Sequence, residues 1–194
     1  KPDILCFDEP LSALDNNRKS LILMYFERLR DSYNIPMLYV THDPSEMARL
    51  ADTVVVMDTG RSTHVGPVYD VLSNPAATGS IGMRVAGTVV SATVVGAKNG
   101  LTHLTFQGGQ LRLPHMERTQ GQTLRLRIAA HDIILSKKHP EGLSALNVLQ
   151  GQITQLHDET GPGVMVQFKV GPTKFLARIT KFKHALNFAR FHRF

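Results

Sequence analysis

The sequence has few of the features that mark secreted or membrane-spanning proteins. Its 194 residues include a single cysteine, Cys6, which cannot form an internal disulfide and therefore fits a reducing cytosol. No apolar run approaches the roughly 18 to 20 residues that a membrane-spanning helix needs. The chain begins Lys-Pro-Asp, with no initiator Met and no signal peptide. We therefore expect it to start inside a longer polypeptide.

Charge is the one compositional property that departs from the ordinary. The net charge is +6, and the 42% of hydrophobic residues is usual for a globular protein. A basic balance either marks a nucleic-acid or anionic-lipid partner or reflects a solvated surface. The length suits one large domain or two small ones.

Apolar runs and helical spacing alternate over the first 77 residues. Leu21, Phe26 and Leu29 recur at helical spacing. Around them lie short apolar runs typical of buried strands, at residues 4–7, 37–40 and 53–57. Strand, helix, strand, helix, strand predicts an α/β layer with a mostly parallel sheet.

The second of these helices has a recognisable start. Asp43 stands at the N-cap position, Pro44 at the first helical position and Glu46 at the site of a capping box. A third, short helix is predicted around Tyr69, closed by Asn74 and Pro75.

From about residue 78 the apolar residues alternate with period two. Leu104 and Phe106 are followed by two glycines, predicting a hairpin whose second strand contains Leu111. Further strands are predicted at 124–128 and 164–170. Short strands at this spacing predict a small all-β barrel over 78–194.

The first apolar run ends in two adjacent carboxylates, Asp8 and Glu9. Ligand sites of open α/β sheets lie at the carboxyl ends of strands. There, one carboxylate can hold Mg²⁺ and the other can polarise a water. The alternative is an acidic pair that caps the next helix. His42 follows the next predicted strand and would lie beside them, although a lone His after a strand is usually structural.

The segment from Ile4 to Asp15 resembles the Walker B segment and D-loop of ABC transporter ATPases. The resemblance implies that Asp8 orients Mg²⁺, directly or through water, and that Glu9 is the general base for ATP hydrolysis. It implies that Ser12, Ala13, Leu14 and Asp15 touch the nucleotide site of a second copy. His42 resembles the switch histidine, which hydrogen-bonds the γ-phosphate of ATP.

The resemblance to an importer ATPase continues from the histidine to about residue 77. The sequence contains no Gly-x-x-x-x-Gly-Lys-Ser/Thr, the loop whose amides cradle phosphates. It also has no glutamine loop and no Leu-Ser-Gly-Gly-Gln signature. In the family these precede the Walker B strand. We therefore expect a C-terminal portion of a longer subunit that, alone, binds ATP weakly or not at all and is inactive.

The β region points to one kind of importer. Residues 126–135 resemble the strand by which importer ATPases enter their C-terminal domain. Residues 144–153 resemble the opening of the molybdate-binding Mop module, of the oligomer-binding-like TOBE class, and 175–180 resemble a later strand. The resemblance implies a molybdate importer at the cytoplasmic face of the bacterial inner membrane. Its ATPase subunit would form a homodimer and work with a membrane permease and, indirectly, a periplasmic molybdate-binding protein.

The anion site of that module departs from the family. Ser144 is either a molybdate ligand or an ordinary turn hydroxyl. Many Mop modules have Arg where this chain has Leu146, which loses a charge-assisted donor. Asn147 is expected to fix a local turn rather than to bind the anion.

The sequence after Thr180 interleaves basic and aromatic residues and does not follow the family. That pattern fits either a nucleic-acid or membrane contact or an altered native end. A barrel without its closing strand exposes an edge, so we expect low stability and impaired anion binding in this domain.

Two alternatives stay open. One is an importer of another solute, such as sulfate or a sugar, whose ATPases also carry TOBE domains; residues 144–153 argue against it. A non-catalytic, nucleic-acid-binding barrel is the other class, and the intact set of Asp8, Glu9 and His42 argues against it.

Overall fold

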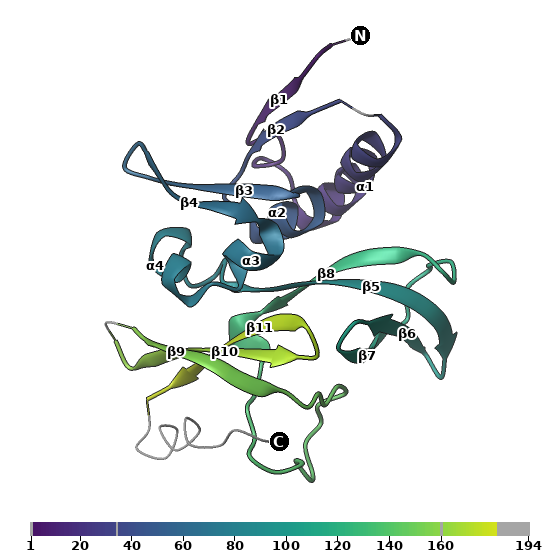
Figure 1. Cartoon of the computed structure of the whole chain (residues 1–194). Helices are drawn as coiled ribbons and strands as arrows, with labels where there is room; N and C mark the ends of the chain where they lie inside the picture. Colours follow the sequence, from purple (N-terminus) through teal and green to yellow (C-terminus); the bar gives the residue numbers. More distant parts are fainter. Residues whose placement is uncertain (1, 34, 160, 182–194) are drawn as a thin grey trace.

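The computed structural model describes residues 2–33, 35–159 and 161–181 of the chain. The fold is mixed α/β, as the sequence predicted (Figure 1). Its helices are α1 (Asn16–Ser32), α2 (Pro44–Leu50), α3 (Val68–Leu72) and α4 (Thr78–Ile81), with short 3₁₀ turns η1 (Pro75–Ala77) and η2 (Ala130–Asp132). The strands are β1 (Leu5–Asp8), β2 (Met37–Val40), β3 (Thr53–Asp58), β4 (Arg61–Pro67), β5 (Gly87–Lys98), β6 (Leu101–Phe106), β7 (Gly109–Pro114), β8 (Thr123–Ala129), β9 (Gln152–Asp158), β10 (Gly163–Val170) and β11 (Thr173–Thr180).

We call the residues that form β1 to β4 and α1 to α4 the N-terminal part, and those that form β5 to β11 the C-terminal part. None of the described helices is long and apolar enough to cross a membrane. The basic and aromatic segment 182–194 lies outside the described residues, so the interpretations of that segment stay predictions.

The sequence predicted a mostly parallel sheet in the N-terminal part. Parallel pairing is found for β1 and β2, which place Leu5 opposite Met37 and Asp8 opposite Val40. The third predicted strand, β3, differs from the prediction because it pairs antiparallel with β4. Thr59 and Gly60 between them have φ of 46° and 77°. Two successive positive φ angles suit the tight turn of a two-residue hairpin, which sends the chain straight back.

The N-cap of α2 is the one that the sequence predicted. Asp43 caps α2 by accepting the backbone N–H groups of Ser45 (2.8 Å) and Glu46 (3.4 Å), with Pro44 in the first turn. The capping-box interpretation of Glu46 is wrong. The backbone N–H of Asp43 donates instead to Oγ1 of Thr41 (3.0 Å), and this leaves the Glu46 carboxylate available for other partners.

The C-terminal part consists of two antiparallel sheets, ordered β7-β6-β5-β8 and β11-β10-β9. The predicted hairpin is confirmed, with Phe106 paired to Gly109 at its turn. The sheets share one core formed by apolar residues of both, namely Val90, Ala92, Val94, Leu104, Phe106, Leu111, Val164, Val166, Phe168, Val170, Phe175 and Ala177. A closed barrel stays a prediction, because the two sheets are separate in their hydrogen bonding.

The two parts meet where α2 and α3 lie against β5 and β8 (Figure 1). The Arg125 guanidinium of β8 donates to the carbonyl of Ala51 (2.7 Å) and to the carboxylate of Asp52 (2.5 Å), just beyond the end of α2. Val89 of β5 packs in the same apolar cluster as Leu72 of α3. These contacts connect the helix that follows His42 directly to the first β-sheet of the C-terminal part.

Candidate functional site

The backbone at the end of β1 has an uncommon conformation. Asp8 is the last residue of the strand, and Glu9 has a φ of 42°, which few non-glycine residues adopt. Three hydrogen bonds hold it there. Glu9 donates its N–H to the carbonyl of Val40 (3.0 Å), and its own carbonyl accepts the N–H (3.2 Å) and the hydroxyl (3.0 Å) of Ser12. Such a conformation costs on the order of 1–3 kcal/mol and persists only where neighbours fix it.

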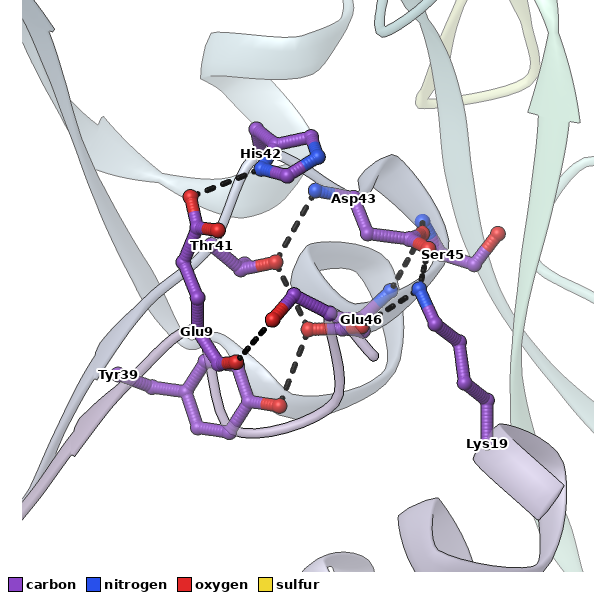
Figure 2. A network of polar contacts seen from close by, with 9 residues as sticks. Glu9, Lys19, Tyr39, Thr41, His42, Asp43, Ser45 and Glu46 are labelled. Atoms are coloured by element: carbon purple, nitrogen blue, oxygen red, sulfur yellow. Dashed lines mark hydrogen bonds and ion pairs between the residues drawn. The ribbon is translucent and has the colours of Figure 1, made fainter. Parts of the chain in front are cut away.

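The structure brings together the two catalytic residues that the sequence predicted. Nδ1 of His42 lies 2.9 Å from Oε1 of Glu9 (Figure 2). The two side chains are largely open to solvent, 80% exposed for His42 and 44% for Glu9. They meet because β1 and β2 are adjacent parallel strands, whose carboxyl ends lie at one edge. The pair can therefore meet a ligand from the solvent side.

Asp8 is exposed beside this pair. Within the described ranges, no hydrogen bond or ion pair engages its carboxylate. The described residues contain no group of three or more His, Cys, Asp or Glu that could hold a metal. Mg²⁺, however, is usually held by one or two carboxylates, waters and substrate phosphates. An open, unengaged carboxylate next to Glu9 fits that mode of binding.

The other two predicted contact residues, Ser12 and Asp15, have partners within their own segment. Ser12 bonds the Glu9 carbonyl, as described above. Asp15 is the N-cap of α1, accepting the amides of Asn17 and Arg18 (3.0 Å each). Both side chains are exposed. They shape the loop between Glu9 and α1, and no described contact joins them to His42.

Sequence reasoning missed a polar network behind the histidine. Oε2 of Glu46 accepts the hydroxyls of Thr41 (2.7 Å) and Tyr39 (3.0 Å), and Oε1 lies 3.5 Å from Nζ of Lys19 (Figure 2). Lys19 also bonds Asp43 at 3.1 Å. Glu46 is only 2% exposed. Glu46 follows the predicted N-cap, Asp43, by three residues, and that spacing indicated a capping box rather than a contact with Thr41.

Hydrogen bonding and burial together shift the pKa values in this network. The hydrogen bond to Asp43 raises the pKa of Lys19. Burial, and then the hydrogen bond to Glu46, raise the pKa of the Tyr39 phenol well above its usual range. Burial alone would raise the pKa of Asp43, but hydrogen bonds from the Ser45 amide and from Lys19 outweigh it and lower that pKa.

The predicted molybdate residue, Ser144, lies in the segment between η2 and β9 and is exposed. Nearby, Leu146 and Asn147 line a cavity of about 850 Å³ whose other walls are largely apolar, and Ser144 is not among its lining residues. Asn147 has a structural role, as expected, but its partner is β7 and not a local turn. Its amide bonds both the N–H (2.7 Å) and the carbonyl (2.9 Å) of Arg112.

At the ends of two adjacent parallel strands, the carboxylate of Glu9 contacts His42, and Asp8 stands directly before Glu9. The resemblance to ABC-type ATP-binding subunits implies such an arrangement. No family model matches the chain. Among curated proteins, it is 42% identical over 92% of its length to the Molybdenum import ATP-binding protein ModC of Rhizobium meliloti (strain 1021). It is 41% identical over 93% of its length to that of Methylococcus capsulatus, and 42% over 97% to that of Thiobacillus denitrificans.

The chain is thus a homologue of the ATP-binding proteins of molybdenum importers. The alignments cover 51%, 51% and 53% of these three proteins, so the chain spans about half the length of the curated relatives that it matches.

Proposed function

We propose that this chain is part of the ATP-binding subunit of an importer that couples ATP hydrolysis to molybdate uptake. The observation that carries the proposal is the contact of 2.9 Å between His42 and Glu9 at the ends of two adjacent parallel strands. The names of the relatives supply the cargo. A capping role for the acidic pair is disfavoured, because Asp15 already caps α1.

Each residue of the site has a distinct task in this proposal. Asp8 would hold Mg²⁺, which neutralises charge on the phosphates when it is bound. The Glu9 carboxylate orients the attacking water and accepts its proton. His42 uses Nδ1 toward Glu9, so Nε2 is the ring nitrogen available to a γ-phosphate oxygen. In the absence of the loop that grips the phosphates, these groups have no fixed substrate to act on.

The proposal also covers the domain organisation of the chain and the partners of the subunit. Residues 1–77 would form the end of an ABC-type ATPase domain, and 78–194 a barrel of the Mop or TOBE type. Ser12 to Asp15 would contact the nucleotide site of a second copy. A membrane permease would be the direct partner, and a periplasmic molybdate-binding protein the indirect one, with the subunit peripheral to the cytoplasmic face of the bacterial inner membrane. Molybdate bound near Ser144 would act as a regulatory ligand.

The test is the full-length subunit reconstituted with its permease in vesicles. We expect Glu9→Gln to lower ATP turnover and molybdate uptake together by at least roughly 100-fold. Glu27→Gln is a matched control, since it also removes a carboxylate but one that pairs with Arg49 away from the site. Turnover that is indifferent to Glu9 would overturn the proposed mechanism.

The identity of the transported solute and the binding of molybdate at Ser144 need separate measurements. Uptake of sulfate or a sugar, without molybdate, would favour the alternative importers. Salt-dependent binding to DNA or RNA would instead favour a nucleic-acid module. Binding of isotopically labelled molybdate to Ser144→Ala and to wild type decides whether Ser144 is a ligand or a turn hydroxyl.

The 194-residue chain alone is expected to turn over no ATP, because its sequence contains no loop that cradles phosphates. A phosphate-release assay on the purified chain checks this. Clear turnover that disappears in Glu9→Gln would contradict it.

A further inference from the structure

Glu46 is a buried carboxylate to which the proposed reaction gives no task. It lies in the first turn of α2 and is 2% exposed. Burying a carboxylate is unfavourable unless it is paired and hydrogen-bonded. Here two hydroxyls and one ammonium group compensate it: the hydroxyls come from β2 and the residue just after it, and the ammonium group comes from α1. The group therefore fixes how those segments lie relative to one another.

Thr41 lies immediately before His42, and its hydroxyl takes part in two hydrogen bonds of this network. It donates to Glu46 at 2.7 Å and accepts the N–H of Asp43 at 3.0 Å. One hydroxyl thus connects the residue before His42 with the residue after it (Figure 2). The peptide units on both sides of His42 are held to a buried anchor.

His42 itself has little to orient it. Its side chain is 80% exposed, and its one described polar contact is with Glu9. An imidazole so open to solvent takes its position mainly from its backbone. Any displacement of residues 41–43 is therefore transmitted to the ring.

The network also reaches the helix that follows the proposed dimer-contact segment. Nζ of Lys19, one turn into α1, bridges Asp43 (3.1 Å) and Glu46 (3.5 Å). Asp15, at the start of that helix, is its cap. The loop from Ser12 to Asp15 and the backbone of His42 are thus connected through a single ammonium group.

We propose that Glu46, acting through Thr41 and Lys19, is a positioning residue that holds His42 toward the γ-phosphate. The inference rests on the proposed ATPase function. Loss of this anchor weakens the recognition of the γ-phosphate and leaves the recognition of the rest of the nucleotide unchanged. A merely structural carboxylate would affect binding of all nucleotides alike.

The variants follow from the contacts. Thr41→Val keeps the β-branched shape and removes the hydroxyl, whereas Thr41→Ser keeps the hydroxyl. In Glu46→Gln the amide oxygen can still accept both hydroxyls at the position of Oε2, but the amide nitrogen then faces Lys19 and the ion pair is lost. Glu27→Gln is the matched control, because it removes another ion pair between α1 and α2, with Arg49, that does not touch residues 41–43.

The test measures the affinities of the full-length subunit for AMP-PNP and for ADP, both with Mg²⁺, by calorimetry. We expect Thr41→Val to lower the ratio of AMP-PNP affinity to ADP affinity roughly tenfold, the equivalent of one charge-assisted hydrogen bond. We expect Glu46→Gln to lower it several-fold, Thr41→Ser to restore most of it, and Glu27→Gln to leave it unchanged. In a His42→Ala background, Thr41→Val should have no further effect.

The outcomes separate the inference from the function on which it rests. If His42→Ala leaves the ratio unchanged, the proposed role of the histidine fails. If His42→Ala lowers the ratio but Thr41→Val and Glu46→Gln do not, the positioning role alone is overturned. An equal weakening of both nucleotides in these variants also overturns it. Should Thr41→Val not fold, Glu46→Gln decides the matter, since it retains both hydroxyl contacts.

Discussion

The N-terminal and C-terminal parts bury their apolar residues to very different degrees. In β10 most residues are buried, whereas in β1 and β2 no residue is. Leu38 and Val40 of β2 are 58% and 49% exposed, although they belong to an apolar run of a kind usual for buried strands. The part that carries the proposed catalytic residues is the more open of the two.

This difference teaches where the folding energy of the chain is concentrated. The C-terminal part encloses one large cluster between two sheets. The N-terminal part divides its buried apolar residues between two smaller clusters. One is formed by Leu11, Leu23 and Leu50, and the other by Ala48, Val54, Val56, Val68, Val71 and Leu72 together with Val89 of β5. Because the stabilisation grows with the apolar area removed from water, we expect mutations of equal kind to cost more in the C-terminal part.

The largest expected effect is that of Phe175→Ala in the C-terminal core. Phe175 is 2% exposed and stacks on Phe168, with ring centroids 5.4 Å apart, while Phe106 lies at 6.0 Å. We expect a loss of about 3–5 kcal/mol in the free energy of unfolding, measured by urea denaturation followed by circular dichroism. A loss below about 1 kcal/mol would contradict the expectation that mutations cost more in the C-terminal part.

The matching change in the N-terminal part is Leu23→Ala. Leu23 is 3% exposed and packs with Leu11 and Leu50. We expect a loss of about 2–3 kcal/mol, at the lower end for such a change, since the cluster is small and can collapse around the cavity. Leu21→Ala on the same helix is the control. Leu21 is 56% exposed, so its change should stay within about 0.5 kcal/mol.

Loss of a contact between the N-terminal and C-terminal parts should lower the free energy of unfolding by less. Arg125→Ala measures this effect. Arg125 bonds Ala51 and Asp52 and lies over the ring of Tyr69, 5.9 Å from its centroid. We expect a loss of about 1–2 kcal/mol and faster hydrogen exchange of the α2 amides than of the β10 amides. Lys174→Ala, whose pair with Asp70 is exposed on both sides, should cost less than about 1 kcal/mol. Equal exchange in both elements would show that the junction does not stabilise α2.

What the sequence predicted well depended on local pattern. The runs at 37–40 and 164–170, the hairpin through Gly109 and the cap at Asp43 were all found, because neighbouring residues determine them. The meeting of Glu9 and His42 was also anticipated, since the ends of adjacent parallel strands lie together.

What it could not predict depended on residues distant in the chain. The positive φ of Glu9 requires the carbonyl of Val40, and the burial of Glu46 requires Lys19 from α1. The contact of Arg125 with the end of α2 joins residues more than seventy positions apart. The domain boundary, the closed barrel and the roles of Ser12, Asp15 and Ser144 stay predictions.

The smallest expected effect is a change in the pH dependence of stability. It tests whether the polar network behind His42 excludes water as the C-terminal core does. The raised pKa of Tyr39 means that the folded protein keeps a phenolic proton that the unfolded chain loses above pH 10. Stability should therefore fall as the pH rises beyond that value. The raised pKa of Lys19 acts in the same direction, since its charge is also retained longer in the folded state.

Tyr39→Phe removes the phenolic share of this dependence together with one hydrogen bond. At pH 7 we expect a loss of about 0.5–1.5 kcal/mol. Between pH 10 and 11 the variant should lose stability less steeply than wild type, because only the Lys19 contribution is left in the network. Urea midpoints at pH 7, 9 and 10.5 measure both quantities, with Tyr33→Phe, an exposed tyrosine, as control. Parallel profiles for wild type and Tyr39→Phe would mean that water reaches the phenol, and that the anchor behind His42 is as open as the sheet edge in front of it.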